Sequence, residues 1–92
     1  RGLGRLVGRN WFHLAETLDE AIAANPDAYE LYISKGNYFA QRKQYGEAEK
    51  AYLTAIAKDP ENIWPYLVAA AFYDAAGFKD KVIPMFQQAL DA

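Results

Sequence analysis

Apolar residues recur every three or four positions along most of the chain, as in the run Ala48, Ala51, Tyr52, Ala55 and Ile56. That spacing is typical of α-helices with one buried face. No segment alternates β-branched and polar residues, and no Asn-Gly or Asp-Gly hairpin pair occurs. The pattern therefore predicts an all-α fold. Five helices are expected, over Trp11–Ala24, Ala28–Arg42, Gly46–Lys58, Glu61–Ala76 and Lys79–Asp91.

Proline, glycine and capping residues mark the ends of these helices. Pro26 and Pro60 stop the first and third, because the residue that precedes a proline avoids the α region. Asp27 is the expected N-cap of the second helix, and Gly77 is the expected stop of the fourth. Pro84 is expected to bend the fifth helix or to delay its start. The short links between helices imply antiparallel neighbours.

The same pattern of residues returns at a spacing of 34. The repeated sets are Ala21, Ala55 and Ala89; Leu18, Tyr52 and Phe86; Leu14, Ala48 and Val82; and Pro26 with Pro60. Several positions in phase at one period indicate an array of helical hairpins rather than a single closed core. In such an array, each unit buries its apolar face only against its neighbours.

This repeat resembles the tetratricopeptide repeat (TPR), whose pattern is Trp-x2-Leu-Gly-x2-Tyr, then Ala-x3-Phe, then Pro. The central unit reads Tyr32-x2-Lys35-Gly36-x2-Phe39, Ala48-x3-Tyr52, Pro60, and the next reads Tyr66-x2-Ala69-Ala70-x2-Tyr73, Val82-x3-Phe86. The resemblance implies a right-handed superhelical array of antiparallel helix pairs, an α-α solenoid of about 2.5 units. It implies one domain over residues 1–92, with a partial repeat at 1–26, a repeat at 27–60 and a C-terminally truncated repeat at 61–92.

Small and large residues of the repeat are expected to have different roles in packing. Small residues let two helices approach closely, and they are Ala21, Gly36, Ala55, Ala70 and Ala89. Large residues fill the gaps between units, and they are Tyr32, Phe39, Tyr52, Tyr66, Tyr73 and Phe86. Two positions depart from the family pattern. Lys35 replaces a leucine and is expected to extend its amine to solvent, and Lys43 stands where the turn usually has glycine.

The resemblance also implies that the first helix of each repeat lines a concave groove. The groove candidates are Glu30, Ile33, Ser34, Asn37, Gln41, Trp64, Leu67, Val68, Ala71 and Asp74. Trp64 is the best candidate for an anchor, with packing against a neighbouring helix as the alternative. Asn37 is expected to bond a peptide backbone or to be simply solvated. The family's basic clamp for carboxylates is missing, so we expect an apolar or weakly basic ligand segment.

Composition narrows the classes of partner. Apolar residues make up 52% of the chain and the net charge is −2, which predicts a folded domain without a general attraction to nucleic acid. The longest uncharged stretch, Asn62–Tyr73, is too short to span a bilayer. Arg1, Arg5 and Arg9 would share one face of a helix and suit phosphates or anionic lipid, but a solvated, partly frayed terminus is the better explanation. The first residue is Arg rather than Met, which suggests a fragment or a processed form.

The residues offer little support for catalysis. There is no cysteine, so thiolate metal sites and cysteine nucleophiles are excluded. His13, Glu16 and Glu20 share a helix face and suit a divalent ion, but exposed charges on a surface helix give the same pattern. Ser34 is the only serine, and no residue near it in the sequence stands out as a general base for its hydroxyl. We therefore expect no enzyme activity, no metal and no cofactor.

The function that these observations favour is a protein-interaction scaffold. It is expected to bind a peptide or helix in the groove, to self-assemble through open array ends, or to do both. The self-association candidates are Val82, Met85, Phe86, Ala89 and Leu90, because no further helix follows to cover them. The alternative is a TPR module appended to a larger enzyme or to a bacterial envelope or secretion machine. Sequence alone does not indicate the compartment.

Overall fold

The computed structural model describes residues 16–92. Residues 16–24 are helical, and the rest of the expected helix Trp11–Ala24 lies outside the described part. The later helices are α2 (Tyr29–Gln41), α3 (Tyr45–Lys58), α4 (Ile63–Ala76) and α5 (Val82–Asp91), with a 3-10 turn η1 (Lys79–Lys81) before α5. From residue 16 onward the fold contains no strand. The prediction of an all-α fold is confirmed.

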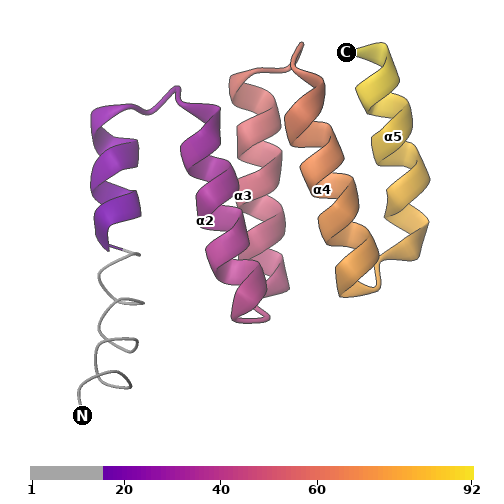
Figure 1. Cartoon of the computed structure of the whole chain (residues 1–92), viewed down its shortest axis with the longest axis horizontal. Coiled ribbons are helices and arrows are strands. Elements are labelled where there is room, and N and C mark those ends of the chain that lie inside the picture. Colours follow the sequence, from indigo (N-terminus) through magenta and orange to yellow (C-terminus); the bar gives the residue numbers. More distant parts are fainter. Residues whose placement is uncertain (1–15) are drawn as a thin grey trace.

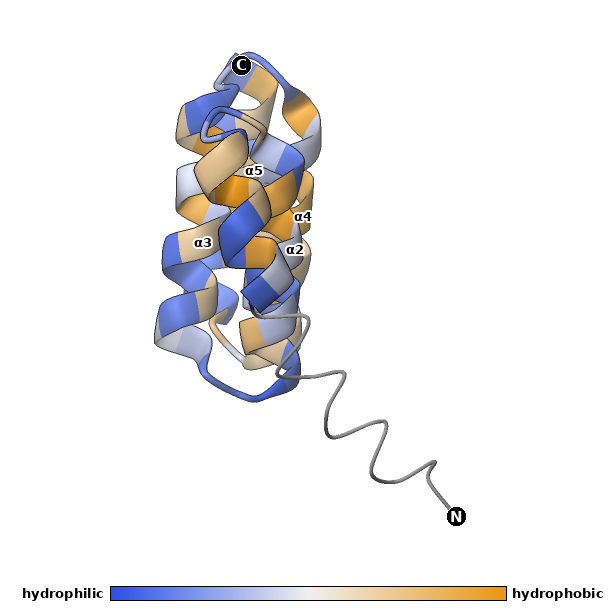
Figure 2. Cartoon of the chain, turned by 90° about the vertical axis from the view of Figure 1, so that its left-hand side faces the viewer, coloured by the Kyte–Doolittle hydropathy of each residue, from blue (hydrophilic) through white to orange (hydrophobic). Residues whose placement is uncertain are grey.

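The helices lie side by side in chain order and form consecutive antiparallel hairpins (Figure 1). The first complete hairpin is α2 with α3, and the second is α4 with α5. Helix α4 contacts both α2 and α3, so it joins the two hairpins. Viewed along the array, α2 and α4 lie on one side and α3 on the other, with hydrophobic positions between them (Figure 2).

One hydrogen bond occurs in both hairpins at the period of the repeat. Tyr32 Oη donates to the carbonyl oxygen of Pro26 at 2.8 Å. Tyr66 Oη donates to the carbonyl oxygen of Pro60, also at 2.8 Å. The donor and the acceptor of the second bond each stand one full repeat after those of the first. Each bond ties the first turn of a hairpin to the proline turn that precedes it, so the sequence repeat is a repeat of contacts as well as of residue types.

The core depends on close approach between α2 and α3. A Cβ atom added at Gly36 would lie 2.6 Å from the ring of Tyr52, well inside contact distance. Glycine at this position therefore lets the ring lie against the backbone of α2. The Tyr52 ring also packs against Phe72 of α4, with the ring centroids 5.0 Å apart. Ala48 and Ala55, on the same face of α3, are fully buried.

The ends of the helices follow the predicted signals with one correction. The N-cap of α2 is Ala28, without a side-chain hydrogen bond, so the prediction of an Asp27 cap is wrong. The Asp27 carboxylate lies 3.6 Å from Lys58 Nζ instead. Gly77 ends α4 with a φ of 91°, as expected. The delay predicted for Pro84 is seen as the 3-10 turn that precedes α5.

Both lysines that depart from the family pattern have a structural explanation. Lys43 has a φ of 60°, the left-handed conformation that glycine adopts without strain, in the turn between α2 and α3. Lys35 Nζ lies 3.5 Å from the Asp19 carboxylate on the preceding helix. The side chain of Lys35 is 36% exposed, so its amine reaches the surface along the packed helices.

Candidate functional site

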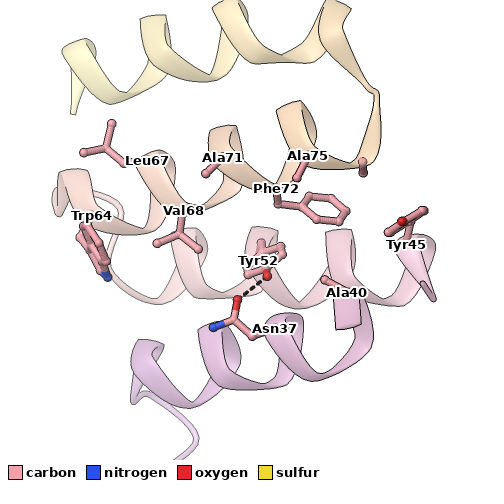
Figure 3. Close-up of a pocket in the computed structure, with 11 residues that line it drawn as sticks. Asn37, Ala40, Tyr45, Tyr52, Trp64, Leu67, Val68, Ala71, Phe72 and Ala75 are labelled. Atoms are coloured by element: carbon pink, nitrogen blue, oxygen red, sulfur yellow. Dashed lines mark hydrogen bonds between the residues drawn. The ribbon is translucent and has the colours of Figure 1, made fainter. Parts of the chain in front are cut away.

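A groove of about 500 Å³ lies between α2 and α4, with α3 behind it (Figure 3). We call it the concave groove. Its lining residues are Asn37, Ala40, Tyr45, Tyr52, Trp64, Leu67, Val68, Ala71, Phe72, Ala75 and Ala76. Trp64 and Tyr45 lie at opposite ends, and the alanines of α4 leave the middle open (Figure 3). Small side chains on α4 therefore create the hollow.

The concave groove carries no formal charge on any lining residue. Trp64 is 56% exposed and Leu67 is 37% exposed, although both are large and apolar. Phe72 is only 7% exposed and helps to form the floor. An uncharged wall with exposed apolar side chains favours an apolar ligand, because burial of both surfaces stabilises the contact. The concave groove therefore offers no opposite charge that could pair with a charged group of a ligand.

Asn37 supplies a polar group of the concave groove, and a hydrogen bond from Tyr52 orients it. Tyr52 Oη donates to Asn37 Oδ1 at 2.5 Å. Burial raises the pKa of Tyr52 to about 12, so its hydroxyl keeps the proton that it donates. One acceptor site of the Asn37 amide oxygen is therefore used, and the amide nitrogen points away from Tyr52 (Figure 3). What Asn37 offers a ligand is a pair of N–H donors, which suits a backbone carbonyl oxygen.

The ten groove candidates from the sequence fall into three groups. The first lines the concave groove: Asn37, Trp64, Leu67, Val68 and Ala71. The second is exposed on α2 outside the lining: Glu30, Ser34 and Gln41. The third faces elsewhere. Ile33 is 9% exposed and belongs to the hydrophobic core, and Asp74 bonds to Lys79 Nζ at 2.5 Å.

Three aromatic residues of the lining, Tyr45, Tyr52 and Phe72, did not appear among the groove candidates from the sequence. Tyr45 and Tyr52 belong to α3, whereas the resemblance assigned the groove to the first helix of each repeat. Both are visible between α2 and α4 because the small residues Ala71 and Ala75 do not cover them (Figure 3). A sequence signal could have identified them. It is a run of alanines on the first helix of one repeat together with aromatic residues on the second helix of the repeat before it.

A second exposed apolar surface lies on α5. Ile83, Phe86 and Leu90 are 66%, 44% and 85% exposed. We call these three residues the α5 stripe. Of the five self-association candidates, Phe86 and Leu90 belong to it. Met85 and Ala89 are buried, and Val82 is partly buried against the core. Ile83 is exposed but was not among the candidates.

A polar cluster ties α3, α4 and η1 together on another part of the surface. Glu49 Oε2 accepts hydrogen bonds from Tyr73 Oη at 2.8 Å and from Lys81 Nζ at 3.0 Å. The bonds from Lys81 and then Tyr73 lower the pKa of Glu49. Burial and the bond to Glu49 raise the pKa of Tyr73. Lys81 Nζ also lies 5.5 Å from the ring centres of Tyr73 and Phe78.

The described residues show no arrangement suited to catalysis. Over residues 16–92, no group of three or more His, Cys, Asp or Glu side chains could hold a metal ion. Glu16 and Glu20 are exposed. His13 lies outside the described part, as do Arg1, Arg5 and Arg9, so the structure does not place them. In the same part of the chain, every helix is too short or too polar to cross a membrane.

Comparison with known proteins supports the fold. No family model matches the chain, and no curated protein matches it either. Among solved structures, the crystal structure of MamA is similar over 98% of this chain, with a TM-score of 0.75 and 23% sequence identity. The likeness covers 53% of the MamA chain, so this chain spans about half of that length. At this identity the likeness shows the fold alone, which is a TPR-like helical-repeat solenoid.

Proposed function

We propose that this chain is a non-catalytic protein-binding module that holds a peptide or helix of another protein in the concave groove. The observation that supports it is Trp64, which is 56% exposed at one end of an uncharged apolar hollow. Tryptophan is strongly enriched among residues that dominate binding energy at interfaces. A large indole left in water beside an open cavity is better explained by a ligand than by the packing of the free chain.

The chemistry of the concave groove describes the ligand that we propose. It is a short segment with apolar side chains and no acidic or basic group that must enter the cavity, because an unpaired buried charge is costly. One backbone carbonyl oxygen of the segment accepts from the amide nitrogen of Asn37. The bond between Tyr52 and Asn37 sets the amide in place before the ligand arrives, which reduces the entropy lost on binding.

A peptide-display selection against the purified chain tests this proposal. The wild type should enrich uncharged apolar sequences, and the variant Trp64→Ala with Asn37→Ala should not. Ile63→Ala is the matched control, because Ile63 is 50% exposed beside Trp64 but does not line the concave groove. It should enrich the same peptides as the wild type. Equal enrichment by the wild type and the double variant would contradict the groove assignment.

Fluorescence gives an independent measurement with the selected peptides. The chain contains two tryptophans, so Trp11→Phe leaves Trp64 as the single reporter. Binding in the concave groove should shift the Trp64 emission to shorter wavelength, because the indole leaves water. A peptide that binds without changing this emission would lie elsewhere on the molecule.

Two further roles remain part of the proposal. The α5 stripe supports self-association, because three large apolar side chains are exposed together on one helix. The alternative is a module appended to a larger enzyme or to a bacterial envelope or secretion machine, and a likeness that covers 53% of the MamA chain is compatible with either role. The sequences that flank this chain in its gene distinguish the two: further repeats alone favour a scaffold, and a catalytic or membrane domain favours the appended module.

A further inference from the structure

The polar atoms that the concave groove offers to a ligand are mostly hydrogen-bond donors. Asn37 presents two N–H groups, and its amide oxygen already accepts from Tyr52 Oη. The ring nitrogen of Trp64 can only donate, and within residues 16–92 no hydrogen bond uses it. The amide nitrogen of Asn37 points toward the Trp64 end of the concave groove (Figure 3). Carbonyl oxygens are therefore the ligand groups that match this end.

This excess of donors separates three kinds of peptide backbone. A helical ligand uses its carbonyl oxygens in its own hydrogen bonds, except in the last turn. An extended strand presents carbonyl oxygens, but it also brings backbone N–H groups. A wall with few acceptors would leave those N–H groups unpaired, which is costly where they are buried. Proline has the carbonyl oxygen and no N–H, so a segment rich in proline fits a wall of donors best.

The aromatic and uncharged lining of the concave groove suits the same kind of segment. Trp64 and Tyr45 lie at its two ends, and the rings of Tyr52 and Phe72 lie between them (Figure 3). Grooves lined by aromatic residues bind proline-rich segments in the polyproline II conformation, which forms before binding and so loses little entropy. No lining residue is charged, and a run of prolines carries no charge that needs a partner.

The length of the concave groove sets the length of the segment. The lining extends from Trp64 in the first turn of α4 to Ala76 at its last residue. At the rise of an α-helix this is about 18 Å. A polyproline II helix advances about 3.1 Å per residue, so about six residues span the distance. Six residues make about two turns of that helix, which places residues three apart on the same wall.

We propose that the ligand of the concave groove is a proline-rich segment of about six residues in the polyproline II conformation. Its carbonyl oxygens accept from the amide of Asn37 and from the ring nitrogen of Trp64, and its proline rings pack on the aromatic side chains. This rests on the proposed function and adds the class of peptide. It distinguishes the ligand from an apolar helix or strand, which would satisfy the broader proposal equally.

Three blocked peptides test the class of ligand, with the Trp64 emission of the Trp11→Phe chain as the signal. The first is Pro-Leu-Pro-Pro-Leu-Pro. The second has alanine at each proline position, and it should bind about tenfold or more weakly because it regains four N–H groups and loses the preformed conformation. The third has N-methylalanine there and should bind more tightly than the second, since it also lacks those N–H groups.

Two results of this titration would overturn the inference. If the alanine peptide bound as tightly as the proline peptide, the concave groove would hold an apolar segment of another conformation, and the proposed function would stand. If none of the three peptides bound, proline recognition would be excluded. The display selection would then decide the proposed function separately, through whether apolar peptides without proline are enriched.

Asn37→Asp tests the donors by calorimetry with the proline peptide. The variant keeps an oxygen that can accept from Tyr52, but it replaces the N–H groups with a carboxylate oxygen that repels a carbonyl. Binding should weaken about tenfold or more. Ser34→Asp is the matched control, because Ser34 is exposed on α2 outside the lining. It adds the same charge and should leave binding unchanged.

Circular dichroism checks that both aspartate variants are folded. A folded Asn37→Asp chain that binds the proline peptide as tightly as the wild type would overturn the carbonyl contact and with it the inference. Enrichment of apolar peptides in the display selection would still support the broader proposal in that case.

Discussion

Helices α3 and α5 are the second helices of consecutive hairpins, yet their corresponding residues have different surroundings. Tyr52 on α3 is 3% exposed, whereas Phe86, its counterpart one repeat later on α5, is 44% exposed. Tyr52 lies between Gly36 of α2 and Phe72 of α4. In the described structure no helix follows α5 to play the part of α4. The difference teaches that neighbours in the array decide whether the same kind of side chain belongs to the core or to the surface.

The largest expected effect of this difference is on stability. Tyr52→Ala should reduce the free energy of unfolding by roughly 3–5 kcal/mol, because it removes a buried ring and leaves a cavity between the two hairpins. Phe86→Ala should cost less than about 1 kcal/mol in the monomer, since the ring is already partly in water. Urea denaturation of both variants at low protein concentration measures the two values. Equal losses would show that α5 is covered in solution as α3 is.

Gly36→Ala is expected to have the next largest effect, a loss of about 1–3 kcal/mol. The added methyl would lie 2.6 Å from the Tyr52 ring, so the ring or the helix must move. The corresponding position in the next repeat is Ala70, which already has a methyl group and is fully buried. Glycine in the first hairpin and alanine in the second therefore permit different depths of packing.

Gly46→Ala is the control for this substitution, measured by the same denaturation experiment. Nothing lies within 4 Å of a Cβ at Gly46, and the residue is exposed on α3. Alanine should stabilise the helix there by about 1 kcal/mol or less, because glycine has more backbone freedom to lose. The two glycine variants should therefore change stability in opposite directions. A gain in stability from Gly36→Ala would contradict the close packing of Tyr52 on α2.

The comparison of α3 with α5 also shows how far the sequence allows prediction. The period of the repeat, the proline turns and the apolar spacing predicted the helices and their order, because those signals are local. The place of Phe86 in the repeat, which it shares with Tyr52, predicted a residue that fills a gap between units, whereas its position on the last expected helix made it a self-association candidate. The two side chains differ in exposure because α4 lies beside α3, whereas no described helix lies beyond α5.

Only some of the residues that line the concave groove were predicted from the sequence. Asn37 and Trp64 were assigned to it from their places on first helices, and both line it. Tyr45 and Tyr52 were not, because their visibility depends on small residues of another helix. Ile33 was assigned to the groove but is buried in the hydrophobic core. Helix faces are readable from spacing, but the boundary between core and cavity depends on three-dimensional packing.

Tyr52→Phe is expected to have a smaller effect and makes α3 more like α5, where the natural residue is Phe86. The loss of the bond to Asn37 should cost about 1 kcal/mol at neutral pH. Burial raises the pKa of Tyr52 to about 12 from its ordinary value of 10.0, so folding disfavours the ionised form. The wild type should therefore lose stability as the pH rises from 10 toward 12, and the variant should lose less. Denaturation at neutral and alkaline pH should show the two proteins converging.

The smallest expected effect concerns Glu49, whose counterpart on α5 is Ile83, a residue that cannot ionise. The bonds from Lys81 and Tyr73 lower the pKa of Glu49 below its ordinary value of 4.5. A lowered pKa in the folded state adds stability above that ordinary value, and this stability is lost as the pH falls through the folded pKa. Because the carboxylate is partly exposed, the contribution should be less than about 1 kcal/mol.

Glu49→Gln should therefore be less stable than the wild type at pH 7, and the difference should shrink as the pH falls toward 3. Every other residue is the same in the two proteins, so the comparison of their urea midpoints isolates the effect of Glu49. Lys81→Met removes the main cause of the lowered Glu49 pKa but leaves the carboxylate in place. Like Glu49→Gln, this variant should lose less stability than the wild type as the pH falls toward 3. If the difference between wild type and Glu49→Gln were the same at both pH values, the contact between α3 and α4 would not depend on this charge. The covered face of α3 would then be held by its apolar residues alone, which is the only kind of contact that the α5 stripe can make.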